Sequence, residues 1–356
     1  VRKRSEAGAE SAAGKIRGSG AFPFARAGTP AYFLPFMKKK SKPQKEPGED
    51  VFAGTDALTT LRDWTRFAVT LFSKRGLFFG QGMGSAFDEA VFLLCGVLKL
   101  PEEGVETFFD ARLTAPEIEE IRRALFRRAV ERVPAAYIAR EAQLGGLRFY
   151  VDERVIVPRS YFVEIIPDQI LPWIPGMDAD VCTGGGSLAV LLARAFPNAH
   201  VDACDISADA LDVARINVAD YALEDRISLW RSDVFDGVPA DGGEGYDVIV
   251  SNPPYEPEAL RETLPEEFRR EPDGALFSGA DGMDVVRRLL PQAARRLARN
   301  GVLLIEVGGL RGALEEAFPR VEFSWLATQD GSDCVCAVSA ASLRENFPPE
   351  RDARAG

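Results

Sequence analysis

From Asp178 onward the chain alternates short apolar runs with helix-like segments, and this alternation restricts the fold more than any other feature. The apolar runs lie near residues 179–182, 199–204, 226–232, 246–251, 301–306, 321–327 and 333–339. Strands alternating with helices predict an α/β fold whose mostly parallel sheet of seven strands is covered on both faces. The turn at residues 329–332 is too short for a crossover helix, so the last two strands should be antiparallel.

Asn252-Pro253-Pro254-Tyr255 directly follows the apolar run at 246–251. Prolines lack an N–H and fix their own φ, so this pair predicts a stiff, extended loop. Such a loop suits a planar –NH2 group. The Asn252 carboxamide oxygen and the Pro253 carbonyl can accept its two hydrogens, while the Tyr255 ring packs on its face. A plain strand-to-loop turn is the alternative interpretation of an isolated Asn-Pro-Pro.

A glycine-rich loop, Gly184–Gly186, follows the first strand and opens a helix. Glycines allow close backbone approach, and a helix N-terminus presents N–H groups to a ligand. Asp205 ends the second strand, where an acid can accept hydrogen bonds from both ribose hydroxyls. By spacing alone, this pattern also fits a dinucleotide such as NAD.

Two further acids favour an adenosyl cofactor with a cationic tail. Asp180 lies just before the glycines, where it would repel a pyrophosphate but attract an ammonium group. Asp233 follows the third strand, where its carboxylate can accept from the adenine amine. With Asp205, these acids follow successive strands and line the crevice in which open α/β sheets bind ligands.

Charge is distributed unevenly along the chain. Residues 1–45 contain 11 Lys or Arg and 2 acidic residues, a net charge of +9, whereas the remainder contains 32 basic and 52 acidic residues, a net charge of −20. An acidic body is a poor binder of duplex DNA, because DNA binding depends on Lys and Arg at phosphates. It suits a basic protein partner instead.

Cysteine and histidine usage argues against a metal site. Five cysteines occur without a C-x-x-C pair, and the only histidine is His200, so we expect no metal. Scattered thiols fit the reducing cytoplasm. No apolar run reaches the length of a membrane span, so we expect no membrane association.

The pattern predicts five regions. We expect residues 1–50 to form a disordered basic tail, which is either solvated or makes weak RNA contacts. Translation starts either at a non-Met codon or at Met37. We expect a helical domain at 51–133, a bridging hairpin at 134–160 with its turn at 152–154, a cofactor-binding domain at 161–345 and a tail at 346–356.

These motifs together carry a resemblance. Residues 180–189, Asp205, Asp233 and residues 252–255 resemble the class I S-adenosylmethionine methyltransferases that act on planar amide or aromatic nitrogen. The runs at 149–160, 268–272 and 278–283 resemble the protein-glutamine methyltransferases. They are most similar to the PrmB type, which modifies a glutamine of large-subunit ribosomal protein three. Gly185, where the family more often has Ser, and Tyr161, where Pro is common, depart from that pattern.

The resemblance implies a Rossmann-like class I methyltransferase domain, a substrate-recognising helical domain and S-adenosylmethionine as cofactor. It implies cofactor contacts from Asp180, Thr183, Gly184, Gly186, Asp205, Ile206, Asp233, Val234 and Asn252, and catalysis by Asn252, Pro253, Pro254 and Tyr255. Arg159 and Glu271 would anchor the substrate or form a structural ion pair. The expected reaction methylates a glutamine side-chain nitrogen of ribosomal protein three during ribosome assembly, with no strong general base evident.

Four other functions remain open at this point. A release-factor glutamine methyltransferase would differ only in its substrate. An adenine-specific nucleic-acid methyltransferase would need to grip phosphates, which the acidic body opposes. A non-catalytic ribosome assembly factor would leave the intact Asn-Pro-Pro-Tyr without a purpose, and a nicotinamide dehydrogenase would leave it unexplained.

Overall fold

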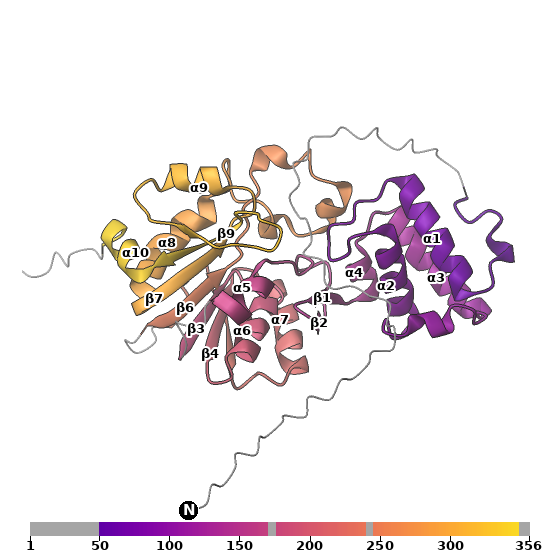
Figure 1. The fold of residues 1–356 in the computed structure, drawn as a ribbon, viewed down its shortest axis with the longest axis horizontal. Coiled ribbons are helices and arrows are strands. Elements are labelled where there is room, and N and C mark those ends of the chain that lie inside the picture. The colour runs from indigo at the N-terminus through magenta and orange to yellow at the C-terminus, as the bar shows by residue number, and fades with distance from the viewer. Residues whose placement is uncertain (1–49, 170–175, 240–244, 349–356) are drawn as a thin grey trace, which may run out of the picture.

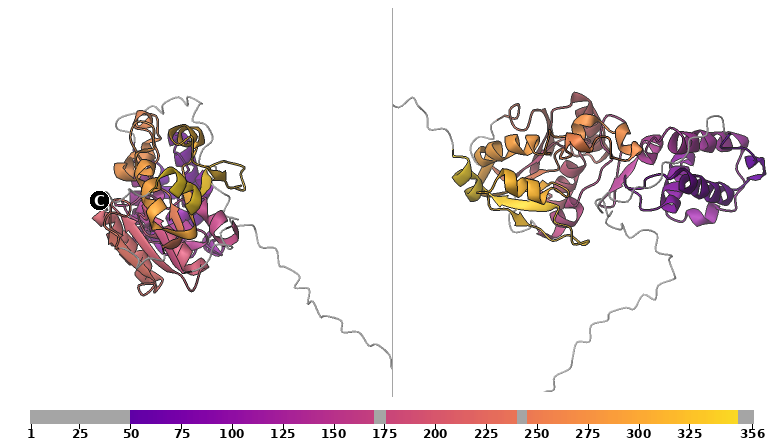
Figure 2. Two further views of the ribbon diagram at one scale, coloured as in Figure 1. Left: turned by 90° about the vertical axis from the view of Figure 1, so that its left-hand side faces the viewer. Right: turned by 90° about the horizontal axis from the view of Figure 1, so that it is seen from above.

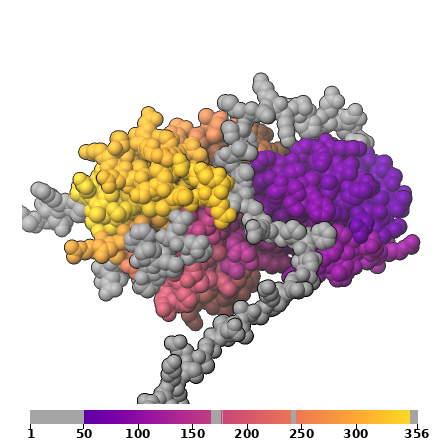
Figure 3. All heavy atoms as spheres, viewed as in Figure 1, coloured from indigo at the N-terminus to yellow at the C-terminus, as the bar shows by residue number. Residues whose placement is uncertain are grey.

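The computed structural model describes residues 50–169, 176–239 and 245–348. The expectations for residues 1–49 and 349–356 therefore concern segments outside the described residues. The described chain forms a helical part and a sheet part (Figures 1 and 2). In the space-filling view the two parts occupy adjoining halves of the molecule (Figure 3). No helix in the described ranges is long and apolar enough to cross a membrane.

The helical part confirms the helices predicted within residues 51–133. It contains η1 (Thr55–Ala57), α1 (Leu61–Arg75), α2 (Ala86–Leu98), η2 (Val105–Phe108) and α3 (Ala115–Ala129). The apolar face of α1 is buried at Leu61, Ala68, Leu71 and Phe72, as their helical spacing requires. At the start of α3 the Thr114 N–H donates to Glu117 Oε2 at 2.7 Å, which completes a capping box.

The joint between the two parts contains α4 (Ala135–Ala139) and a hairpin of β1 (Ala142–Leu144) and β2 (Leu147–Phe149). Gly145 and Gly146 turn this hairpin with φ values of 58° and 75°, which glycine adopts without strain. The predicted turn at 152–154 is present, because the Val155 N–H donates to the Asp152 carbonyl at 3.2 Å and Asp152 also binds the Arg154 guanidinium. The prediction that this turn closes the hairpin is wrong, since Val155 and Val157 form no strand and pack against α7 (Ala208–Asp220).

The sheet has seven strands in the order β5-β4-β3-β6-β7-β9-β8. Five are parallel: β3 (Met177–Val181), β4 (His200–Asp205), β5 (Ile227–Arg231), β6 (Tyr246–Ser251) and β7 (Leu297–Glu306). β9 (Val335–Ser339) is antiparallel to β7 and to the edge strand β8 (Ser324–Trp325). The predicted mostly parallel sheet with an antiparallel last strand is confirmed, although β8 is shorter than the 321–327 expected.

Helices cover both faces of the sheet (Figure 1). One face is covered by α5 (Phe162–Gln169), α6 (Ser187–Ala195) and α7 (Ala208–Asp220), and the other by α8 (Asp284–Arg296), α9 (Arg311–Ala317) and α10 (Ala340–Asn346). Along β6, Val248 and Val250 pack in the core on the side of α5 and α6, and Ile249 packs in the core on the side of α8. This alternation is the two-residue period of a strand. Burial on both faces explains why these strands read as continuous apolar runs.

Candidate active site

The strand order reverses between β3 and β6, because the chain runs outward from β3 to β5 and then returns to β3's other side. The carboxyl ends of the two strands meet there: Val181 pairs with Ser251, whose Oγ donates to the Val181 carbonyl at 2.7 Å. Such a switch point is where open α/β sheets bind ligands. The glycine loop leaves from one side of it, and Asn252 follows on the other.

The loop between β3 and α6 turns sharply toward open space. Cys182, Gly184 and Gly186 have φ values of 64°, 54° and 79°, a region that glycine favours. A Cβ added to Gly184 would meet no atom within 4 Å, so the backbone there is open to a ligand. At Gly185 a Cβ would make ordinary contacts beginning at 3.4 Å, so the serine expected from the resemblance would fit.

Asp180 lies beneath this loop and is fully buried. Its Oδ2 accepts from Thr183 Oγ1 at 2.6 Å, whereas its buried Oδ1 has no hydrogen-bond partner among the described residues. Burial raises the pKa of Asp180 to about 7, and the Thr183 hydrogen bond opposes that rise. A buried carboxylate oxygen without a partner is costly, and it fits a ligand that brings an N–H donor or a bridging water.

Asp205, at the end of β4, is held facing the glycine loop. Its two oxygens accept from the backbone N–H groups of Gly184 and Ser207, each at 2.9 Å. The next residue, Ile206, is 61% exposed, the largest exposure among the exposed large hydrophobic residues. A fixed carboxylate beside an open apolar side chain is suited to an adenosyl group, whose ribose is polar and whose ring is flat and apolar.

Asp233 follows β5, which lies two strands outward from β3 in the sheet. Its Oδ1 is 3.2 Å from Arg288 Nε on α8, and both side chains are partly exposed. The adjacent Val234 is buried, and its carbonyl accepts from Cys204 Sγ at 3.1 Å. An adenine amine at Asp233 would therefore share the carboxylate with Arg288, and the adenine contact remains a prediction.

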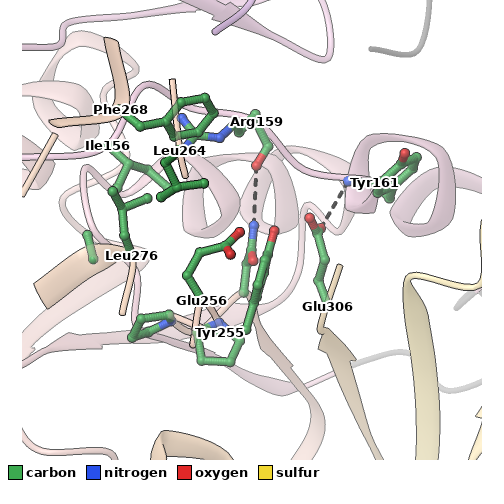
Figure 4. Close-up of a pocket in the computed structure, with 13 residues that line it drawn as sticks. Ile156, Arg159, Tyr161, Tyr255, Glu256, Leu264, Phe268, Leu276 and Glu306 are labelled. Atoms are coloured by element: carbon green, nitrogen blue, oxygen red, sulfur yellow. Dashed lines mark hydrogen bonds between the residues drawn. The ribbon is translucent and has the colours of Figure 1, made fainter. Parts of the chain in front are cut away.

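A hollow, here named the Asn252 pocket, opens beyond β6 (Figure 4). It encloses about 640 Å³, including space open to solvent, and it is lined by Ile156, Arg159, Tyr161, Asn252, Pro253, Pro254, Tyr255, Glu256, Leu264, Phe268, Ala275, Leu276 and Glu306. Asn252 Nδ2 donates to the Arg159 carbonyl at 3.2 Å. Within the described chain no hydrogen bond reaches the Asn252 oxygen, so that oxygen can accept from a ligand.

Arg159 and Glu271, predicted as substrate anchors, form a bidentate ion pair with each other. The guanidinium nitrogens lie 2.6 and 2.7 Å from the two Glu271 oxygens, and the Val157 N–H donates to the same carboxylate at 3.0 Å. The guanidinium also lies over the Phe268 ring at 5.0 Å (Figure 4). This geometry is the structural ion pair that the sequence left as the alternative, and it fixes the pocket wall.

Glu306 is a pocket residue that sequence reasoning missed. It ends β7, and its Oε2 accepts from Ser160 Oγ at 2.5 Å and from the Tyr161 N–H at 3.0 Å. Burial raises its pKa to about 7, an effect that these hydrogen bonds and Arg159 oppose. The sequence does contain a signal for this residue. Glu306 ends an apolar run that forms the strand beside β6, so its side chain should lie at the same edge of the sheet as Asn252.

Two further residues outside the predicted set hold the site together. Asn217 on α7 donates to the carbonyls of Gly185 and Tyr150, at 2.7 and 3.1 Å, and so ties the glycine loop to the joint. Glu267, in the pocket-wall segment, accepts from Arg128 at 3.3 Å and Arg132 at 3.0 Å of the helical part. Neither residue carries a local motif, so only the tertiary structure reveals these contacts.

The sheet topology, the glycine loop over an acid with one unpartnered oxygen and the adjoining carboxamide pocket together define a Rossmann-like methyltransferase. In agreement, the sequence profile of the methyltransferase small domain matches residues 161–280. Methyltransferases of this class generally use S-adenosylmethionine.

Three similar proteins carry the name "Ribosomal protein uL3 glutamine methyltransferase". The chain is 48% identical to that of Burkholderia pseudomallei, over 80% of this chain and 95% of the relative. It is 47% identical to that of Neisseria meningitidis serogroup A over the same shares, and 40% identical to that of Bradyrhizobium diazoefficiens over 82% and 93%. The chain belongs to the uL3 glutamine methyltransferase family.

Proposed function

We propose that this protein transfers a methyl group from S-adenosylmethionine to the side-chain amide nitrogen of a glutamine in ribosomal protein uL3. The observation that carries the proposal is Asn252, which lines the pocket and whose carboxamide nitrogen donates to the Arg159 carbonyl, leaving its oxygen to accept from a ligand. A primary amide is a planar –NH2 group that can donate to that oxygen. The names of the relatives give the substrate.

The crevice residues bind the cofactor in this proposal. Asp205 accepts from the ribose, Ile206 and Asp233 contact the adenine, and Asp180 attracts the amino-acid end beneath Gly184. The bound cofactor supplies a methyl group made electrophilic by a sulfonium. The residues fit such a group because the crevice combines open backbone at the glycine loop with an unpartnered buried oxygen.

The Asn252 pocket orients the acceptor nitrogen. An amide nitrogen is a weak nucleophile because its lone pair is delocalised into the carbonyl, so placement must contribute much of the rate. Asn252 Oδ1 and the Pro253 carbonyl accept the two N–H hydrogens, and Tyr255 packs on the amide plane. The stiffness of the proline pair keeps these acceptors in place before the substrate arrives.

The helical part, with the joint, provides substrate recognition in this proposal. Its buried arginines bind Glu267, which lies one residue before the pocket-lining Phe268. A basic ribosomal protein is attracted to a body whose net charge is −20 outside residues 1–45. We place the reaction in the cytoplasm, where ribosomal proteins are available before and during assembly.

The test incubates the purified full chain and labelled S-adenosylmethionine separately with uL3, a release factor and adenine-containing DNA. Label on uL3 alone is the expected result. Label on the release factor would move the substrate while keeping the chemistry, and label on DNA would overturn the charge argument. Bound cofactor with no label on any substrate would favour a non-catalytic assembly role.

A further inference from the structure

One short segment, residues 159–161, fixes two groups of the Asn252 pocket at once. The Arg159 carbonyl accepts from Asn252 Nδ2, and the next two residues, Ser160 and Tyr161, both donate to Glu306 Oε2. In Figure 4 one dashed line leaves Arg159 and another joins Tyr161 to Glu306. The Asn252 carboxamide and the Glu306 carboxylate are therefore held in a fixed relation at the carboxyl ends of two neighbouring strands.

Glu306 uses only one of its oxygens in these contacts. Within the described ranges Oε1 receives no hydrogen bond, and the side chain lines the pocket although the residue is 4% exposed. The charged or titratable groups that act on it are the Arg159 guanidinium, the Tyr255 hydroxyl and the Cys334 thiol. Arg159 is already neutralised by Glu271, so Glu306 is a pocket carboxylate without an ion-pair partner of its own.

We propose that Glu306 is a catalytic residue whose carboxylate accepts the proton that the glutamine nitrogen loses on methylation; this inference rests on the function proposed above. The new nitrogen–carbon bond forms as the carbon–sulfur bond of the methyl donor breaks, which leaves a neutral thioether. The nitrogen, briefly positive, gives one proton to Oε1 and becomes a secondary amide. A carboxylate beside the developing charge also lowers the barrier electrostatically.

Glu256 is the other pocket acid, and the structure favours Glu306 over it. No hydrogen bond fixes the Glu256 carboxylate within the described chain, whereas Glu306 ends a central strand and is held by two donors. Burial raises the pKa of both acids, to about 7 for Glu306. A base poised near neutrality and held in one position is the arrangement expected for proton transfer.

The experiment measures kcat for methyl transfer to uL3 from about pH 5 to about pH 9 and cofactor affinity by calorimetry. In the parent, kcat should rise with pH through an inflection near pH 7, as Glu306 ionises. Glu306→Gln keeps an oxygen that can accept from Ser160 and Tyr161, yet it should lower kcat on the order of 100-fold and abolish the inflection. Cofactor affinity should stay unchanged.

Ser160→Ala separates proton acceptance from a structural role. It removes a hydrogen bond that lowers the pKa of Glu306, so the inflection should move to higher pH, an effect a purely structural Glu306 would not give. The proposal is overturned if Glu306→Gln keeps kcat within a fewfold with its inflection, or if Glu256→Gln alone removes the inflection. A parent that fails to methylate uL3 refutes the proposed function itself.

Discussion

The two halves of the site are built in different ways. The proposed cofactor crevice comes from the loops that follow three successive strands, β3, β4 and β5, between Asp180 and Val234, each close to its own strand end. The Asn252 pocket gathers four segments that are distant in sequence: 156–161, 252–256, 264–276 and Glu306. Local geometry therefore shapes the crevice, whereas long-range hydrogen bonds and ion pairs shape the pocket. Substitutions on the two sides should accordingly separate cofactor binding from methyl transfer.

The strongest test of that separation is Asn252→Ala. Among the described residues that line the pocket, Asn252 alone carries a side-chain amide. If its oxygen orients the acceptor nitrogen as proposed, kcat should fall on the order of 1,000-fold. Cofactor affinity, measured by calorimetry, should change less than threefold or so, since the crevice stays intact. Turnover within a fewfold of the parent would remove Asn252 from the mechanism.

Glu267→Ala tests the long-range assembly of the pocket. Glu267 is buried between Arg128 and Arg132, so its loss should lower the free energy of unfolding by roughly 3–5 kcal/mol. The neighbouring Glu266→Ala is the matched control, because that side chain is 57% exposed against 2% for Glu267, and it should cost less than about 1 kcal/mol. Equal costs in urea unfolding would mean that this ion cluster does not join the two parts.

The buried Glu306 should also make stability depend on pH. Its pKa is raised in the folded chain from an ordinary 4.5 to about 7, so its stabilising contribution is complete below about pH 4.5 and is lost as pH rises through 7. Glu306→Gln should therefore gain stability relative to the parent between about pH 5 and about pH 8, on the order of 3 kcal/mol. Asp180 is present in both proteins and cancels. A difference that does not change with pH would show that Glu306 is not buried as described.

In the proposed cofactor crevice, Asp205→Ala should weaken cofactor binding and leave kcat nearly unchanged, the reverse of the effect expected for Asn252→Ala. It removes a carboxylate placed to bind ribose hydroxyls, so the Kd of the cofactor should rise about 10- to 100-fold. At saturating cofactor, kcat should remain within a fewfold of the parent. Unchanged affinity in calorimetry would exclude the ribose contact.

The smallest effect is expected for Gly185→Ser. A Cβ there makes contacts no shorter than 3.4 Å and the backbone needs no positive φ, so cofactor affinity and melting temperature should change little. Gly186→Ser is the contrasting control, because φ is 79° and the Cβ would lie 3.1 Å from Ala214, and it should be clearly destabilising. Similar melting temperatures for the two variants would contradict the loop geometry.

The crevice was more accessible to sequence reasoning than the pocket, for a physical reason. The alternation of apolar runs with helical segments predicted the sheet, and the short last turn predicted its antiparallel hairpin. Each acid of the proposed crevice lies close to the end of its own strand in the sequence. Asn252 to Tyr255 could be found because the prolines interrupt a strand locally. The position of Glu306 at the end of an apolar run was a signal for the sheet edge, but its hydrogen bonds could not be predicted, because its partners Ser160 and Tyr161 lie about 145 positions away.

The joint shows the same limit. The sequence predicted a hairpin within 134–160 and a turn at 152–154, and both are present, but that turn does not close the hairpin. An alternating apolar run such as Leu147, Phe149 and Val151 does not say which side chains pair and which pack on another helix. Gly145-Gly146 is the signal that local turn chemistry offered. The pairing of Arg159 with Glu271, 112 residues apart, likewise depends on the folded chain.

The most direct test of the central claim locates the transferred methyl group. uL3 treated with the full chain and deuterium-labelled S-adenosylmethionine would be digested and sequenced by tandem mass spectrometry. We predict label on the side-chain nitrogen of one glutamine, absent when Asn252→Ala replaces the parent. Label on a lysine or arginine, or label that persists in the Asn252 variant, would contradict a pocket built to orient a planar amide.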